Sequence, residues 1–135
     1  MVVCQNLTRY LDENGQMELS ANEVDAGSFD NCEIVSYSLS QSSFSCADLG
    51  ESTVTLTVVD GEGNSQNCSA QLTLLDTLAP VVQCQNIVRY LDENGQLQLS
   101  PADLDQGSFD NCGIASLLVS KTNFSCEDLG TLTVI

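Results

Sequence analysis

The stretch Thr53-Val54-Thr55-Leu56-Thr57-Val58 alternates threonine with an aliphatic residue at every second position. Because successive side chains of a strand point to opposite faces, this alternation predicts a half-buried β-strand. The same period of two occurs at Met17–Leu19, Val35–Leu39 and Ser69–Leu75. An Asn14-Gly15 pair precedes the first of these runs and is a strong signal for a β-hairpin. The sequence therefore predicts an all-β fold.

Helix is expected only as single turns. Ser20 and Glu23 have the spacing of a capping box, and Ser100-Pro101 places a proline at the first helical position after a cap. Six or seven short strands, spaced by turn residues and with few aromatic residues, are typical of an immunoglobulin-like β-sandwich. A core of this size is marginal without disulfide bonds.

The chain repeats itself with a period of 80 residues. The blocks Arg9–Gln16 and Gly27–Cys32 recur unchanged at Arg89–Gln96 and Gly107–Cys112, and 32 of 55 positions are identical between residues 1–55 and 81–135. We therefore expect tandem domains. Residues 1–80 form a complete repeat, and residues 81–135 form a second repeat that is truncated at its C-terminal end. Both ends of the chain look like cuts through a longer tandem array.

Composition excludes several classes of function. The 135 residues include 19 Asp and Glu, 3 Lys and Arg and no His, which gives a net charge of -16. So few cations cannot neutralise a nucleic-acid backbone or hold an anionic membrane surface. No apolar run approaches the roughly 20 residues of a membrane span. The absence of His removes His-dependent hydrolases, and we expect no enzyme activity, no nucleic-acid partner and no direct membrane insertion.

Seven cysteines without metal-type spacing predict disulfide bonds and an extracellular location. Three of the first repeat's four cysteines recur in the second, whereas Cys68 has no counterpart before Ile135. We therefore expect Cys84, the counterpart of Cys4, to be left unpaired by the truncation. Four cysteines in a repeat allow three pairings, and the spacing does not choose among them.

The order of the motifs CQN, LDENG, DxGSxDNCxI, FxCxDLG and TVTLTVxDGxGNxxxC resembles the HYR-like repeats of large cell-surface adhesins of the Bacteroidetes group. Gliding-motility adhesins exported by the type IX secretion system look most similar. The resemblance covers all of the first copy and all that is present of the second. It implies a disulfide-stapled, immunoglobulin-like repeat on the bacterial cell surface.

The resemblance also implies a disulfide pairing. HYR modules carry cysteines in their opening and closing strands, which corresponds to a Cys4–Cys68 bond. Cys32–Cys46 then forms an additional pair, and Cys112–Cys126 repeats it in the second copy. The rival pairing, Cys4–Cys32 with Cys46–Cys68, stays open.

The turns Asp25–Asn31 and Asp105–Asn111 place two carboxylates, a hydroxyl and several carbonyls within a few residues. Such hard oxygen ligands suit Ca²⁺, but the same sequence suits an Asx-rich turn that caps the next strand. The charge excess favours a structural Ca²⁺ that is shared with the linker at the junction of two repeats. The candidate ligands are Asp25, Ser28, Asp30, Asp76, Asp105, Ser108 and Asp110.

The resulting hypothesis is a stalk or spacer module of a large adhesin filament that supports adhesion or gliding motility. Its partners are neighbouring repeats of the same chain and other filament or surface proteins. The alternative is a repeat that itself binds carbohydrate or a partner protein. Asp76-Thr77-Leu78 resembles the motif at which Bacteroidetes O-glycosylate exported proteins, so Thr77 is a candidate glycosylation site, although a plain linker explains it equally well.

Overall fold

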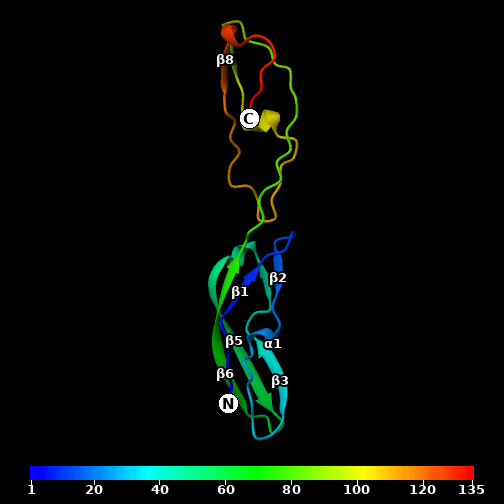
Figure 1. The fold of residues 1–135 in the computed structure, drawn as a ribbon, viewed down its shortest axis with the longest axis vertical. Helices are drawn as coiled ribbons and strands as arrows, with labels where there is room; N and C mark the ends of the chain where they lie inside the picture. The colour runs from blue at the N-terminus through cyan, green and yellow to red at the C-terminus, as the bar shows by residue number, and fades with distance from the viewer. The chain divides into compact units, whose positions relative to one another are not determined.

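The computed structural model describes residues 1–135 as two compact units, Met1–Leu78 (unit 1) and Ala79–Ile135 (unit 2). The division falls two residues before the boundary expected from the repeat. Strands dominate the regular structure of unit 1, and every helix is a single turn (Figure 1). The chain is therefore all-β, and disulfide bonds are present.

Unit 1 contains six strands in two sheets. They are β1 (Leu7–Tyr10), β2 (Gln16–Glu18), β3 (Ile34–Leu39), β4 (Ser43–Ser45), β5 (Gly50–Asp60) and β6 (Ser65–Leu75). The larger sheet has the order β1-β6-β5-β3, in which β1 runs parallel to β6 and the other neighbours are antiparallel. The smaller sheet is the antiparallel pair of β2 and β4. Strands are thus present at all four runs that the period of two predicted.

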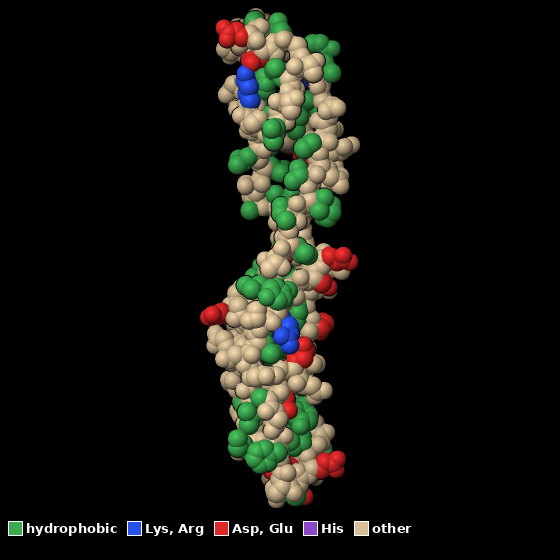
Figure 2. All heavy atoms as spheres, in the orientation of Figure 1, with side chains coloured by type: hydrophobic (Ala, Val, Ile, Leu, Met, Phe, Trp, Pro, Cys, Tyr) green, Lys and Arg blue, Asp and Glu red, His purple; other side chains and the backbone are tan.

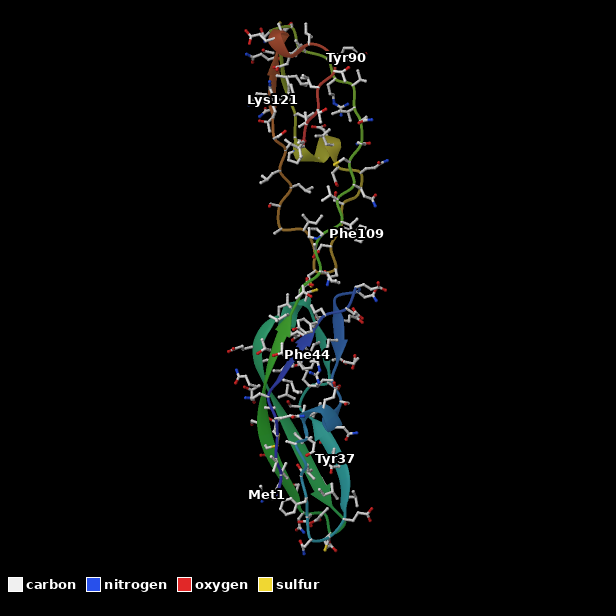
Figure 3. The ribbon with its side chains drawn as sticks, viewed as in Figure 1. Met1, Tyr37, Phe44, Tyr90, Phe109 and Lys121 are labelled. Atoms are coloured by element: carbon white, nitrogen blue, oxygen red, sulfur yellow. A yellow bond between two sulfur atoms is a disulfide. The ribbon has the colours of Figure 1, made fainter.

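Every second residue of the two long strands contributes to the core of unit 1. The buried set is Val54, Leu56 and Val58 of β5, with Ala70, Leu72 and Leu74 of β6. Phe44 of β4 is 4% exposed and points into the same unit (Figure 3). The threonines between the buried residues of β5 are only partly buried. The half-buried strand predicted at Thr53–Val58 is therefore confirmed.

The Asn14-Gly15 turn does not close a β-hairpin. A tight turn does form, because the Asp12 N–H donates to the Gln16 carbonyl at 2.9 Å and Gly15 adopts a φ of 70°. However, β1 pairs with β6 and β2 pairs with β4, so the strands on either side of the turn belong to different sheets. The hairpin prediction was wrong because the closing strand β6 is the partner of β1.

The expected single helical turns are present as α1 (Ala21–Val24) and α2 (Pro101–Leu104). At α1 the Ser20 N–H donates to Glu23 Oε2 at 2.8 Å, which satisfies a backbone donor that the helix leaves free. The equivalent bond at α2 runs from the Ser100 N–H to Asp103 Oδ2, also at 2.8 Å. Pro101 takes the first helical position, as predicted.

Unit 1 has two distinct ends. The proximal end consists of Met1, the turn Phe29–Cys32 and the β5–β6 turn Asp60–Asn64, which together line one depression. The distal end holds the Asp12–Gln16 turn and the last residue of β6, where the Leu11 N–H donates to the Leu75 carbonyl at 3.0 Å. The chain thus enters unit 1 at its proximal end and leaves it at the distal end (Figure 1).

Unit 2 reproduces the small sheet of unit 1 but not the large one. β7 (Gln96–Gln98) pairs with β8 (Asn123–Ser125), as β2 pairs with β4. No residues of this chain correspond to β6, so the segment equivalent to β1 has no neighbouring strand. Tyr90 in that segment is 85% exposed, and apolar side chains are visible on this unit's surface (Figures 2 and 3). Unit 2 therefore has an open core.

Candidate functional site at the proximal end of each repeat

The acidic turn after α1 is closed by its own carboxylate. Asp25 Oδ1 accepts a hydrogen bond from the Ser28 N–H at 2.9 Å, and Oδ2 accepts one from the Gly27 N–H at 3.3 Å. Gly27 has a φ of 92°, a backbone conformation that side chains with a Cβ rarely adopt. The sequence Asp-x-Gly-Ser therefore forms an Asx-type turn.

The same turn fastens the first residues of the chain to unit 1. The Val3 N–H donates to Ser28 Oγ at 3.0 Å, and the Ala26 N–H donates to the Val3 carbonyl at 2.9 Å. The Phe29 N–H reaches the Met1 carbonyl at 2.9 Å. The turn thus positions the segment that leads to Cys4 and β1.

Unit 2 repeats this arrangement with nearly the same distances. Asp105 Oδ1 accepts from the Ser108 N–H at 2.9 Å, and Ser108 Oγ accepts from the Gln83 N–H at 2.9 Å. Asp110 Oδ2 accepts from the Cys112 N–H at 3.0 Å. Because unit 2 lacks the large sheet and still forms the turn, the turn depends on local interactions rather than on the sheet.

The hydrogen bonds within the turn lower the pKa of its first carboxylate in each unit. Partial burial tends to raise the pKa of Asp25, but hydrogen bonds from Ser28 and Gly27 outweigh it, and the net pKa lies below that of an ordinary aspartate. Hydrogen bonds from the Ser108 side chain and backbone lower the pKa of Asp105 in the same way. Each negative charge is stabilised by donors of its own loop.

The residues expected to bind Ca²⁺ do not form a metal site within either unit. No three Asp, Glu or Cys side chains converge in a geometry that could hold a metal ion. Asp25 uses both oxygens on its own turn, and Asp30 accepts from the Cys32 N–H at 3.2 Å. The Asx-turn interpretation accounts for these contacts. The expectation that Asp76 shares a cation with Asp105 and Asp110 concerns two separate units and stays a prediction.

The linker between the units is an exposed segment. Asp76 Oδ1 accepts from the Leu78 N–H at 3.1 Å, which bends the chain around Thr77. The Thr77 side chain is exposed, as a glycosylated threonine must be. Glycosylation at this residue stays a prediction.

One disulfide joins Cys4 to Cys68 within unit 1, with their Cα atoms 5.8 Å apart. This is the pairing that the resemblance implies for the opening and closing strands. It ties the segment just before β1 to a residue near the start of β6, and the two residues are 64 positions apart in the sequence. Cys4 and Cys68 lie close together because β1 runs parallel to β6 and beside it. Cys84, the counterpart of Cys4, is a free thiol, as expected.

The expected Cys32–Cys46 and Cys112–Cys126 bonds do not form. Cys32 and Cys126 are free thiols, whereas Cys46 and Cys112 are disulfide-bonded to other residues. Cys32 lies at the proximal end, two residues before the pairing of Ile34 with Asp60, and Cys46 lies at the distal end, beside the Gly15 carbonyl. The two ends are separated by the length of β5, which at about 3.3 Å per residue amounts to roughly 30 Å. A disulfide needs Cα atoms within about 7 Å, so the Cys32–Cys46 pair is excluded. In unit 2 the free thiol of Cys126 shows that the Cys112–Cys126 bond is absent.

A depression of about 590 Å³ lies beside Cys32 at the proximal end of unit 1. Met1, Phe29 and Ile34 give it an apolar part, and Asp60 and Glu62 are among its acidic residues. Phe29 is 61% exposed. This depression was not predicted from the sequence, although an aromatic residue next to Asp-Asn-Cys in a turn is a signal that could have indicated an exposed apolar site.

Comparison with protein-family models and with curated protein sequences finds no match for this chain. None of its helices has the length and hydropathy needed to cross a membrane.

Proposed function

We propose that this chain is a spacer segment of a large bacterial cell-surface adhesin, built from HYR-like, immunoglobulin-like β-sandwich repeats in tandem. The observation that carries the proposal is the direction of the chain through unit 1. It enters at the proximal end, leaves at the distal end, and its first and last strands run parallel and adjacent. A repeat with this path can be joined in series to any number of identical repeats.

The disulfide of unit 1 suits the same role. In a filament under tension, force enters each repeat through the residues before β1 and leaves through the residues after β6. Cys4 lies before β1 and Cys68 lies near the start of β6, so the force passes covalently through the bond between them and then along the rest of β6. The residues between them are protected from being pulled out. A stalk needs this resistance to unfolding under tension. The proposal assigns no catalytic activity to the chain.

The motif resemblance supports a location outside the cell, on bacteria that use such a filament for adhesion or gliding motility. The disulfides are compatible with that location. Neighbouring repeats and other surface proteins are then the partners. The proposal also includes a structural Ca²⁺ between neighbouring repeats. The chain has 19 acidic residues and 3 basic ones, and a divalent cation would compensate part of this negative charge.

Solution scattering of the intact chain, together with binding to a glycan array, tests the proposal. A spacer is expected to scatter as an elongated particle and to bind no glycan on the array. A compact particle, or saturable binding to a defined glycan that a Phe29→Ala change abolishes, would contradict the spacer role and favour a binding module. Gln41→Ala, at a second exposed position of unit 1, serves as the matched control.

A further inference from the structure

The large sheet of unit 1 has one face toward the core and one face toward solvent. The buried residues of β5 and β6 alternate with residues that point to the solvent side, which we call the outer face. It is formed by β1, β6, β5 and β3, all within residues 7–75. The outward residues in the middle of the two central strands are Thr53, Thr55, Thr57, Asn67, Ser69 and Gln71. Each of them is exposed or half-buried, so no other part of unit 1 covers the outer face.

The outer face is nearly free of charge, although the chain has a net charge of -16. β3, β6 and the run Ser52–Val59 of β5 contain no Asp, Glu, Lys or Arg. Arg9 of β1 lies opposite the buried Leu74 and pairs with Glu23, so it belongs to the other side of the sheet. Glu51, near the start of β5, is the single charged residue on the outer face.

This distribution of charge suits a partner that is itself acidic. The carboxylates of unit 1 lie in its turns and on the smaller sheet, as at Asp12, Glu18 and Asp60. A basic partner would be attracted to those surfaces and would gain nothing from a neutral face. A second copy of this chain would be repelled by them, because like charges that meet across an interface destabilise it. On the outer face, two copies can meet without bringing their carboxylates together.

The side chains of the outer face also suit contact with another sheet. Threonine is β-branched, so its χ1 angle is restricted before binding and little rotamer freedom is lost on contact. Two sheets pack face to face about 10 Å apart when their side chains interdigitate. Near the distal end, Tyr10 is 56% exposed and lies opposite Leu75, which is 39% exposed, and the pair adds an apolar part to the face.

The size of the outer face sets the strength of such a contact. Its four strands have 4, 6, 11 and 11 residues. At a rise of about 3.3 Å per residue and a strand spacing of about 4.8 Å, the face covers roughly 500 Å², so two copies bury roughly 1,000 Å². This area is near the lower limit for a specific interface between proteins. One repeat can therefore form a weak contact with a second copy.

We propose that two copies of this chain associate side by side through the outer faces of unit 1, in a symmetric dimer whose twofold axis passes near Thr55 and Ser69. These two residues lie opposite each other in the middle of β5 and β6. In a filament of many repeats the contact would occur once per repeat, so weak contacts would add up to firm lateral association of neighbouring filaments. That role rests on the proposed spacer function, whereas the contact itself needs only unit 1.

Sedimentation equilibrium of the full chain over a wide range of concentrations tests the proposal. The free thiols are first alkylated with iodoacetamide in the absence of a reductant, so that the Cys4–Cys68 bond is kept and no disulfide links two copies. We expect a monomer–dimer equilibrium. Dimerisation should strengthen as the salt concentration is raised from low to moderate, because screening reduces the repulsion between two chains of net charge -16. Dimerisation that weakens with salt would contradict a neutral interface.

Three variants locate the contact by charge. Ser69→Glu places two new carboxylates beside the twofold axis and should weaken dimerisation by roughly a hundredfold. Ser69→Gln has nearly the same size without the charge and should weaken it far less. Ser42→Glu adds the same charge at an exposed serine between β3 and β4, outside the outer face, and should leave dimerisation nearly unchanged. Circular dichroism checks that each variant is folded.

Two-dimensional NMR at rising protein concentration gives an independent map. The amide signals of Thr53–Thr57 and Asn67–Gln71 should shift, whereas those of α1 should not. A chain that stays monomeric, equal effects of Ser69→Glu and Ser42→Glu, or shifts confined to unit 2 would each overturn the proposal. A neutral glycan that shifts the same amides of a monomeric chain would also overturn it, because the outer face would then bind carbohydrate. Scattering at low concentration tests the spacer function separately, so the two can fail independently.

Discussion

Replacing both Cys4 and Cys68 by serine should change how far unit 1 extends when it is unfolded by force. In the intact protein, tension between Met1 and the linker passes through the Cys4–Cys68 bond. Only the residues outside this pair can then be drawn out. Without the bond, the whole unit extends.

The size of the effect follows from the sequence separation of the pair. The bond bridges two residues with a sequence separation of 64. At about 3.5 Å per extended residue, the variant should release about 220 Å more contour length than the intact protein. The same change removes a constraint on the unfolded chain, and for a loop of this size the loss of stability is about 4 kcal/mol.

Single-molecule force spectroscopy measures the contour length directly. Handles attached at Met1 and at Leu78 restrict the measurement to unit 1. Because the double variant is destabilised, the wild-type protein in a reducing buffer provides a second measurement without any substitution. Equal contour lengths for the oxidised and reduced proteins would refute the reasoning, because they would show that force does not pass through this bond.

Four further outcomes are expected. Leu72→Ala opens a cavity at a residue that is 1% exposed and should lower the free energy of unfolding by about 2–5 kcal/mol in urea titrations. The control Leu75→Ala, on the same strand but 39% exposed, should cost much less. Gly27→Ala forces a Cβ into a backbone with φ of 92° and should cost about 1–2 kcal/mol, whereas Gly61→Ala, whose added Cβ meets only ordinary contacts, should be nearly neutral. The pKa of Asp25 is lowered by folding, so its contribution to stability is present above the unfolded pKa of about 4 and is lost as the pH falls through the folded pKa. Urea midpoints of Asp25→Asn should fall less steeply with acid than those of the wild type, and identical profiles would contradict this assignment. If the acidic turns need only their own backbone donors, adding a chelator should leave the melting temperature of the chain unchanged, and a clear rise on adding Ca²⁺ would instead establish the calcium expected from the sequence.

Local features of this fold could be predicted because neighbouring residues determine them. The alternation at Thr53–Val58 fixes which side chains of β5 face the core. The capping box of Ser20 and Glu23 and the Asx turn at Asp25 depend on contacts within four residues. These features appear in the structure where the sequence places them.

Pairing between distant segments could not be predicted in the same way. The Asn14-Gly15 turn looks like a hairpin turn, but the choice of β6 as the partner of β1 depends on a strand that begins fifty residues later. The Cys32–Cys46 expectation failed for a related reason. A count of cysteines gives the number of possible pairs, whereas the length of β5 decides which pairs can meet. For calcium, the sequence shows the available oxygens but not that backbone donors already use those of Asp25.

The pairing of β1 with β6 also determines the order in which a repeat can fold as it is made or exported. Leu7 lies opposite Leu72, so the strand at the edge of the large sheet remains without a partner until nearly the whole repeat has emerged. Contacts between such distant residues form slowly, because a long loop must close first. If the repeat is exported through a narrow pore, as the proposed function requires, it can complete its sheet only after its last strand is outside. Folding on the far side would then prevent the chain from sliding back, one repeat at a time.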